Sequence, residues 1–176
     1  MYEPKENPKI KIFILLCFMT LTIFGQSDTK GKEELKKGVI GKTVEDGKPV
    51  IWKFVNEYPD KTRKDKYQWL TVVSWKYDGK SNNGMPLKEI NNQMIKLEEA
   101  IEDIQKKELC IHAYSRTGNN LKELVYYIPD QTKFMKAFNE ALKNHPKYPI
   151  KINFYKDSNW KDFTKLLDLF NKKKVN

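Results

Sequence analysis

Residues 84–105, GMPLKEINNQMIKLEEAIEDIQ, carry the clearest helical pattern in the chain. Apolar residues recur there at steps of three and four, which places them along one side of a helix. Pro86 suits a first helical turn, because the N–H that proline lacks would have no partner there. Gly84 permits a tight turn before it. The pattern predicts a long amphipathic helix that packs on a core through Leu87, Ile90, Met94, Leu97, Ile101 and Ile104.

Short apolar segments on both sides of this helix indicate strands. Residues of alternating polarity predict five strands, over Val50–Asn56, Tyr67–Tyr77, Leu109–Thr117, Leu121–Ile128 and Ile150–Lys156. A second helix is expected from Gln131 to about His145, and a last one near the end of the chain. The order is then β-β-α-β-β-α-β-α. Without its first strand and last helix it is the ferredoxin-like split β-α-β unit, an α+β fold with two helices on one face of an antiparallel sheet.

The N-terminus has the features of an export signal. Lys5, Lys9 and Lys11 precede an apolar run, Ile12–Phe24, which is short for a bilayer span and suits the core of a signal peptide. We therefore expect a signal peptide over residues 1–26, a flexible lead-in over 27–47 and a single domain over 48–172. The product would be periplasmic or secreted, and an uncleaved membrane anchor is the alternative.

The net charge of +10 comes almost wholly from lysine, since Arg63 and Arg116 are the only arginines among 33 basic residues. Lysine is a strongly hydrated point charge, whereas arginine is the usual fork for phosphates and base edges. The composition therefore favours a soluble lysine-rich surface over a nucleic-acid site. Cys110 is the only cysteine after the expected cleavage, which excludes an internal disulfide.

The usual catalytic and metal-binding patterns are missing from the sequence. There is no glycine-rich phosphate loop and no Gly-x-Ser-x-Gly elbow. His112 and His145 make a zinc site with one cysteine only if carboxylates supply the remaining ligands. His112 is expected to be a packed or surface strand residue rather than a ligand or base. We expect no cofactor and no metal.

Acidic residues of the long helix leave a choice between an ion site and a solvated surface. Glu98 and Glu102 are four residues apart, as are Glu99 and Asp103, so each pair shares a side of the helix but the two sides differ. A solvated helix face is the favoured interpretation. Glu98 lies at the edge of the apolar stripe, so its carboxylate either finds a partner or bends out to water.

Strand alternation predicts an aromatic and basic face. Along Leu109–Thr117, one set of residues is expected to face the helices, namely Leu109, Ile111 and Ala113. The other set is expected to face away with residues of neighbouring strands, namely Cys110, His112, Tyr114, Arg116, Tyr126 or Tyr127, Lys151 and Tyr155. RNA-recognition sheets stack bases on such a face. Alternatively, the first strand, the last helix or the leading segment covers it.

Three further residues have expected structural roles. Arg116 pairs with Glu98 or Asp157, or else binds an anionic ligand. Asp157 is expected to cap the last helix, and Trp160 to anchor that helix in the core.

Several motifs occur in a fixed order between residues 50 and 170. They are Gly84-Met85-Pro86 at a loop end, Leu97-Glu98-Glu99 in the helix, Arg116-Thr117-Gly118 at a strand end, and Asp157 with Trp160. In this order they resemble the uncharacterised bacterial "domain of unknown function" family 695, although the spacing at Arg116 is shortened. More remotely the pattern is similar to ribonuclease E inhibitor protein B, which implies a ferredoxin-like fold. The resemblance supplies no catalytic residues, and an exported protein would not meet a cytoplasmic ribonuclease.

The sequence thus predicts an exported, non-enzymatic binding or regulatory module for a protein or small ligand. The candidate ligand-binding residues are Arg116, Tyr114, His112 and Tyr155, and the candidate structural polar residues are Glu98, Asp157 and Trp160. A nucleic-acid partner is disfavoured, and the membrane is contacted only through the signal segment. The alternatives are a sheet surface that binds nucleic acid or anions, and an enzyme that uses Arg116, Glu98 and Asp157.

Overall fold

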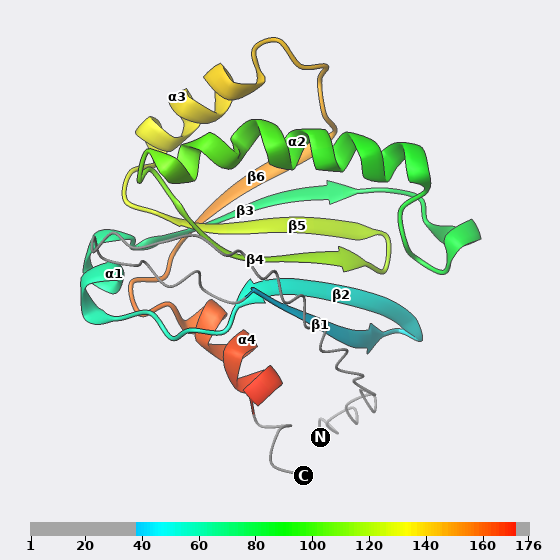
Figure 1. Ribbon diagram of the computed structural model, residues 1–176, viewed down its shortest axis with the longest axis horizontal. Coiled ribbons are helices and arrows are strands. Elements are labelled where there is room, and N and C mark those ends of the chain that lie inside the picture. Colours follow the sequence, from blue (N-terminus) through cyan, green and yellow to red (C-terminus); the bar gives the residue numbers. More distant parts are fainter. Residues whose placement is uncertain (1–37, 172–176) are drawn as a thin grey trace, which may run out of the picture.

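A computed structural model describes residues 38–171, which form a six-stranded antiparallel sheet in the order β1-β2-β4-β5-β3-β6 (Figure 1). The strands are β1 (Gly38–Glu45), β2 (Lys48–Val55), β3 (Trp69–Lys76), β4 (Ile111–Gly118), β5 (Leu121–Ile128) and β6 (Ile150–Lys156). The helices are α1 (Lys61–Lys66), α2 (Lys88–Lys106), α3 (Gln131–Leu142) and α4 (Lys161–Asn171), with a 3₁₀ turn η1 at Lys80–Asn82. Helices α2 and α3 lie on one face of the sheet, and α4 lies on the other (Figure 1).

Four of the strands form the predicted ferredoxin-like unit. Strands β4, β5, β3 and β6 are neighbours in that order, and each adjacent pair is antiparallel. In chain order the same segment is β3-α2-β4-β5-α3-β6, the split arrangement with both helices on one face. The α+β fold class is therefore confirmed. The hairpin of β1 and β2 extends the sheet beyond β4.

This first hairpin corrects the predicted start of the domain. The prediction of a flexible lead-in over residues 27–47 is wrong from Gly38 onward, because β1 pairs with β2 along its whole length. The turn residues Asp46 and Gly47 both have positive φ, 49° and 75°, as a tight hairpin requires. Glycines and charged residues in β1 hide the alternation that marks a strand. The predicted signal peptide, residues 1–26, lies outside the described residues, as do residues 27–37 and 172–176.

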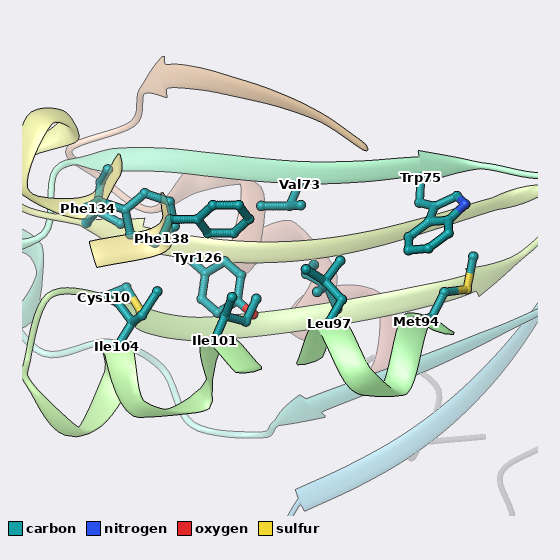
Figure 2. Close-up of a cluster of buried hydrophobic side chains, with 12 residues drawn as sticks. Val73, Trp75, Met94, Leu97, Ile101, Ile104, Cys110, Tyr126, Phe134 and Phe138 are labelled. Carbon is teal, nitrogen blue, oxygen red and sulfur yellow. The ribbon is translucent and has the colours of Figure 1, made fainter. Parts of the chain in front are cut away.

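The amphipathic prediction for α2 holds along most of the helix. Met94, Leu97, Ile101 and Ile104 are all buried beneath it. The helix starts at Lys88, so Pro86 and Leu87 precede it, and Leu87 is exposed instead of lining the core. Figure 2 shows these side chains meeting aromatic residues of the sheet and of α3. This first core contains Val73, Trp75, Met94, Leu97, Ile101, Ile104, Cys110, Leu124, Tyr126, Ile128, Phe134 and Phe138.

A second core lies between the opposite face of the sheet and α4. It contains Phe54, Tyr67, Leu70, Ala113, Val125, Tyr127, Trp160, Phe163, Leu166, Leu167 and Phe170. Strand β3 contributes to both cores, through Val73 on one face and Leu70 on the other. The last helix covers much of the face that could have been open.

Two connections differ in how well the sequence predicts them. The connection between β2 and β3 contains the short helix α1, which is not predicted and which Asp60 caps by accepting a hydrogen bond from the backbone N–H of Arg63 at 2.8 Å. The turn between β4 and β5 is the tight hairpin that its residues predict, since Asn119 and Asn120 have φ of 47° and 63°.

Candidate functional site

A bulge in β4 divides the predicted ligand-binding residues between the two faces of the sheet. The pairing of β4 with β5 shifts register between His112 and Tyr114. His112 therefore lies on the α2 side, against Tyr126, whereas Tyr114 lies on the α4 side. The face prediction is wrong for four residues of this region, because Ile111 and Ala113 pack on the α4 side and Cys110 packs under α2 with His112 beside it. A bulge interrupts the strict alternation on which that prediction depends.

Arg116 is held in an ion-pair cluster on the α4 side. Its Nη2 lies 2.6 Å from Glu45 Oε2, and its Nη1 lies 3.6 Å from Glu123 Oε2. Its guanidinium also lies 5.5 Å from the centroid of the Trp52 ring. Burial raises the pKa of the Glu123 carboxyl, and the Arg116 charge opposes that shift. The prediction of a structural ion pair is right, but the predicted partners, Glu98 and Asp157, are wrong.

The aromatic side chains of the predicted open face are mostly covered. The Tyr114 hydroxyl donates to Asp162 Oδ2 of α4 at 2.8 Å. Tyr127 stacks on Trp160 with ring centroids 3.8 Å apart, and Tyr126 is buried under α2. Tyr155, at the sheet edge, is 52% exposed. The last helix therefore covers most of this face, which is the alternative given for it, and the aromatic and basic surface is not formed.

Asp157 and Trp160 have the structural roles predicted for them. Asp157 accepts hydrogen bonds from the backbone N–H of Lys161 at 2.9 Å and of Asp162 at 3.0 Å, at the start of α4. It also accepts one from the Tyr127 hydroxyl at 2.7 Å. Burial raises the pKa of the Asp157 carboxyl, but these hydrogen bonds outweigh it and leave the pKa below its usual value.

Glu98 of α2 forms an ion pair with a residue of the sheet. Its Oε1 lies 2.5 Å from Nζ of Lys122, which comes from β5. Glu98 was left with two alternatives, a partner or an orientation toward water, and the structure shows the partner, which the sequence does not indicate. Because Glu98 lies on the α2 side and Arg116 on the α4 side, the structure does not bring Arg116, Glu98 and Asp157 together. The enzyme site expected from those three residues is not formed.

A surface groove of about 440 Å³ lies between α2 and the part of the sheet that α2 leaves uncovered. Helix α2 supplies one wall, strands β4 and β5 supply the floor, and Lys53 of β2 stands opposite α2. The lining residues are Lys53, Ile95, Glu98, Glu99, Glu102, Gln105, His112, Leu124 and Tyr126. Three carboxylates and one lysine, Lys53, therefore line the groove.

His112 and Tyr126 provide neutral polar groups at the floor of the groove. Burial, together with the charges of Lys53 and Lys122, lowers the pKa of His112 to about 4, so its ring is neutral at pH 7. Burial raises the pKa of Tyr126, which is 4% exposed. The two rings contact each other with centroids 5.2 Å apart. Within residues 38–171 the Tyr126 hydroxyl has no hydrogen-bond partner, whereas the His112 ring forms a hydrogen bond with the backbone of Tyr114, which opposes the fall in its pKa.

The residue pattern of α2 indicates part of this groove. Ile95, Glu98 and Glu102 fall on one side of α2, at steps of three and four. That pattern places two carboxylates beside the apolar stripe, where a surface groove forms. Lys53 and Tyr126 join them only through strand pairing distant in sequence, which the pattern of the helix does not reveal.

No helix among residues 38–171 is both long enough and apolar enough to cross a membrane. In the same range, no group of three or more His, Cys, Asp or Glu side chains is arranged to hold a metal ion.

Comparison with known proteins places the chain in a family. No curated protein and no solved structure matches it. The model of a family described as "Family of unknown function (DUF695)" matches residues 39–167, which covers most of the chain and nearly all of the described sheet and helices. The chain therefore belongs to this family of unknown function, DUF695.

Proposed function

We propose that this protein is a non-enzymatic binding module, and that the groove beside α2 takes a positively charged ligand. The observation that carries the proposal is the groove lining, in which Glu98, Glu99 and Glu102 lie near the Tyr126 hydroxyl, which has no partner among residues 38–171. Carboxylates attract cations, and a neutral polar group without a protein partner supplies hydrogen-bond capacity that a ligand can satisfy. The groove combines both properties.

The carboxylates differ in how strongly the protein already neutralises them. Glu98 is paired with Lys122 at 2.5 Å, and Glu102 lies 4.0 Å from Lys106. Glu99 is exposed and makes no ion pair within the described residues. One wall of the groove thus retains negative charge that a ligand cation can reach.

The properties of His112 support binding rather than acid–base catalysis. A general base works best when its pKa is near the working pH. With a pKa of about 4, His112 is a weak base at neutral pH, although it remains a good neutral hydrogen-bonding group. The groove therefore suits recognition better than proton transfer.

The charge of the groove can be tested with short Gly/Ser peptides that carry Lys and Arg, or Asp and Glu, at the same positions. We expect the basic peptide to bind and the acidic peptide not to bind, with shifts of Ile95, Leu124 and Tyr126 in an NMR titration. Replacing both Glu99 and Glu102 by Gln should weaken binding about tenfold, because two exposed charge contacts are lost. Added salt should weaken it further.

Glu89→Gln is the matched control, since Glu89 is an exposed carboxylate of α2 that does not line the groove. It should leave the affinity unchanged. Equal binding of the basic and acidic peptides, or equal loss in the control and the double variant, would show that the groove is not a cation site.

We also propose that the protein acts outside the cytoplasm, on the basis of the basic start and the apolar run Ile12–Phe24. Expression of the full chain in a bacterial host should give a periplasmic or secreted product whose mass lacks residues up to about 26. Mass spectrometry of the purified product measures this directly. A cytosolic product that keeps its first residues would contradict the proposal.

A further inference from the structure

We propose that the groove recognises a guanidinium group, and that its ligand is an arginine side chain in a segment of a partner protein. This inference rests on the proposed function and names the chemical class of the cation. It depends on the number of acceptors in the groove, on their directions and on the paired aromatic rings at its floor.

The acceptors approach the groove from more than one direction. Glu98 and Glu102 lie one helical turn apart on α2, so their carboxylates lie along the same wall. The Tyr126 hydroxyl comes from β5 at the floor, and Figure 2 shows it directed toward α2. The Tyr126 side chain is 4% exposed, and its hydroxyl has no hydrogen-bond partner among the described residues. A ligand N–H in the groove can donate a hydrogen bond to this hydroxyl.

A guanidinium matches these acceptors better than an ammonium does. It carries five N–H donors in a fixed plane, so it can bridge a carboxylate and a second acceptor at an angle to it. Oε1 of Glu98 pairs with Lys122 at 2.5 Å, and the carboxylate has a second oxygen, Oε2, that can accept from a ligand. An ammonium has three donors around a single point and holds its water more strongly.

The floor of the groove carries no positive charge of its own. The rings of His112 and Tyr126 contact each other at 5.2 Å between centroids, with their planes inclined by 60°. Because His112 is neutral at pH 7, its ring does not repel the incoming charge.

The remaining lining explains why a single arginine fits better than a basic tract. Ile95, which is 43% exposed, provides apolar surface for the methylene stem of the side chain. Lys53, on the opposite wall, would repel a second cation. The expected ligand is therefore one arginine flanked by uncharged residues.

The test uses the purified protein and three labelled peptides that are identical except for a central Arg, Lys or citrulline. We expect the Arg peptide to bind about tenfold more tightly than the Lys peptide, and citrulline, which keeps the shape but lacks the charge, to bind most weakly. Free arginine is measured alongside. Much weaker binding of free arginine supports a protein segment as the source of the guanidinium, and equal binding overturns that assignment.

Tyr126→Phe separates recognition from structure, because it keeps the ring and removes only the hydroxyl. It should reduce the preference for Arg over Lys while the protein stays folded, and Glu89→Gln should leave the preference intact. Equal affinity for the Arg and Lys peptides would overturn this inference and leave the proposed cation site standing. Failure of all basic peptides to bind would contradict both this inference and the proposed cation site.

Discussion

Trp160→Ala is expected to lower the free energy of unfolding by about 3–5 kcal/mol, the usual cost of deleting a large buried aromatic side chain. The indole is 1% exposed and stacks on Tyr127 at 3.8 Å. Its Nε1 donates to the backbone carbonyl of Tyr67 at 2.8 Å. The substitution would leave a cavity at the start of α4 and an unpaired carbonyl. Urea denaturation followed by far-UV circular dichroism measures the change.

Tyr155→Ala is the control for this substitution, because Tyr155 is an aromatic residue that is 52% exposed. It should change stability by less than about 0.5 kcal/mol. Trp160→Phe, which keeps a ring but loses the N–H donor, should fall between the two. If Trp160→Ala cost no more than Tyr155→Ala, then α4 would not be anchored through this residue, and the second core would have to be held by its other members.

Arg116→Ala is expected to cost about 3–5 kcal/mol at pH 7, the range for removing one partner of a buried ion pair. The side chain of Arg116 is 13% exposed and lies between Glu45 and Glu123. Removing it would leave two carboxylates facing each other without a cation, and would also remove the contact with the Trp52 ring. Arg63→Ala is the natural control, because Arg63 makes a more exposed pair with Glu57 at 2.9 Å and should cost about 1 kcal/mol or less.

The pH dependence of the Arg116→Ala deficit gives an independent check. The folded protein raises the pKa of Glu123 above its ordinary 4.5, so the folded state holds that proton more strongly than the unfolded state does. The ionised carboxylate therefore destabilises the fold at neutral pH, and this cost disappears as the pH falls to 4.5 and below. Without Arg116 the pKa rises further. The loss of unfolding free energy caused by Arg116→Ala should thus become smaller between pH 7 and pH 4.5. A loss that stays constant would show that lost packing dominates.

Local sequence patterns predict much of this fold because local chemistry determines it. The apolar residues of α2 from Met94 to Ile104 are buried as their spacing requires. Asn119 and Asn120 adopt the positive φ of a tight turn, which asparagine tolerates well. Strand β1 was missed because its glycines and charged residues carry no clear alternation, and only pairing with β2 makes it a strand.

The candidate site was harder to predict because it depends on contacts between distant segments. Glu98 was expected to need a partner, but nothing local selects Lys122 among so many lysines. His112 was assigned to the wrong face because a bulge leaves no mark that a single sequence reveals. Glu98 and His112 both line the groove, so the groove depends on two features that the sequence does not predict, the Glu98–Lys122 pair and the bulge in β4.

The irregularity in β4 also makes the number of residues in this strand important. His112 and Tyr114 lie on opposite faces of the sheet only because β4 has one additional residue between their pairing positions. Deleting a residue here would restore strict alternation and turn either the groove residue or the partner of Asp162 to the wrong side. Exchanging side chains in this strand is therefore a local change, whereas altering its length by one disturbs both layers of the protein at once.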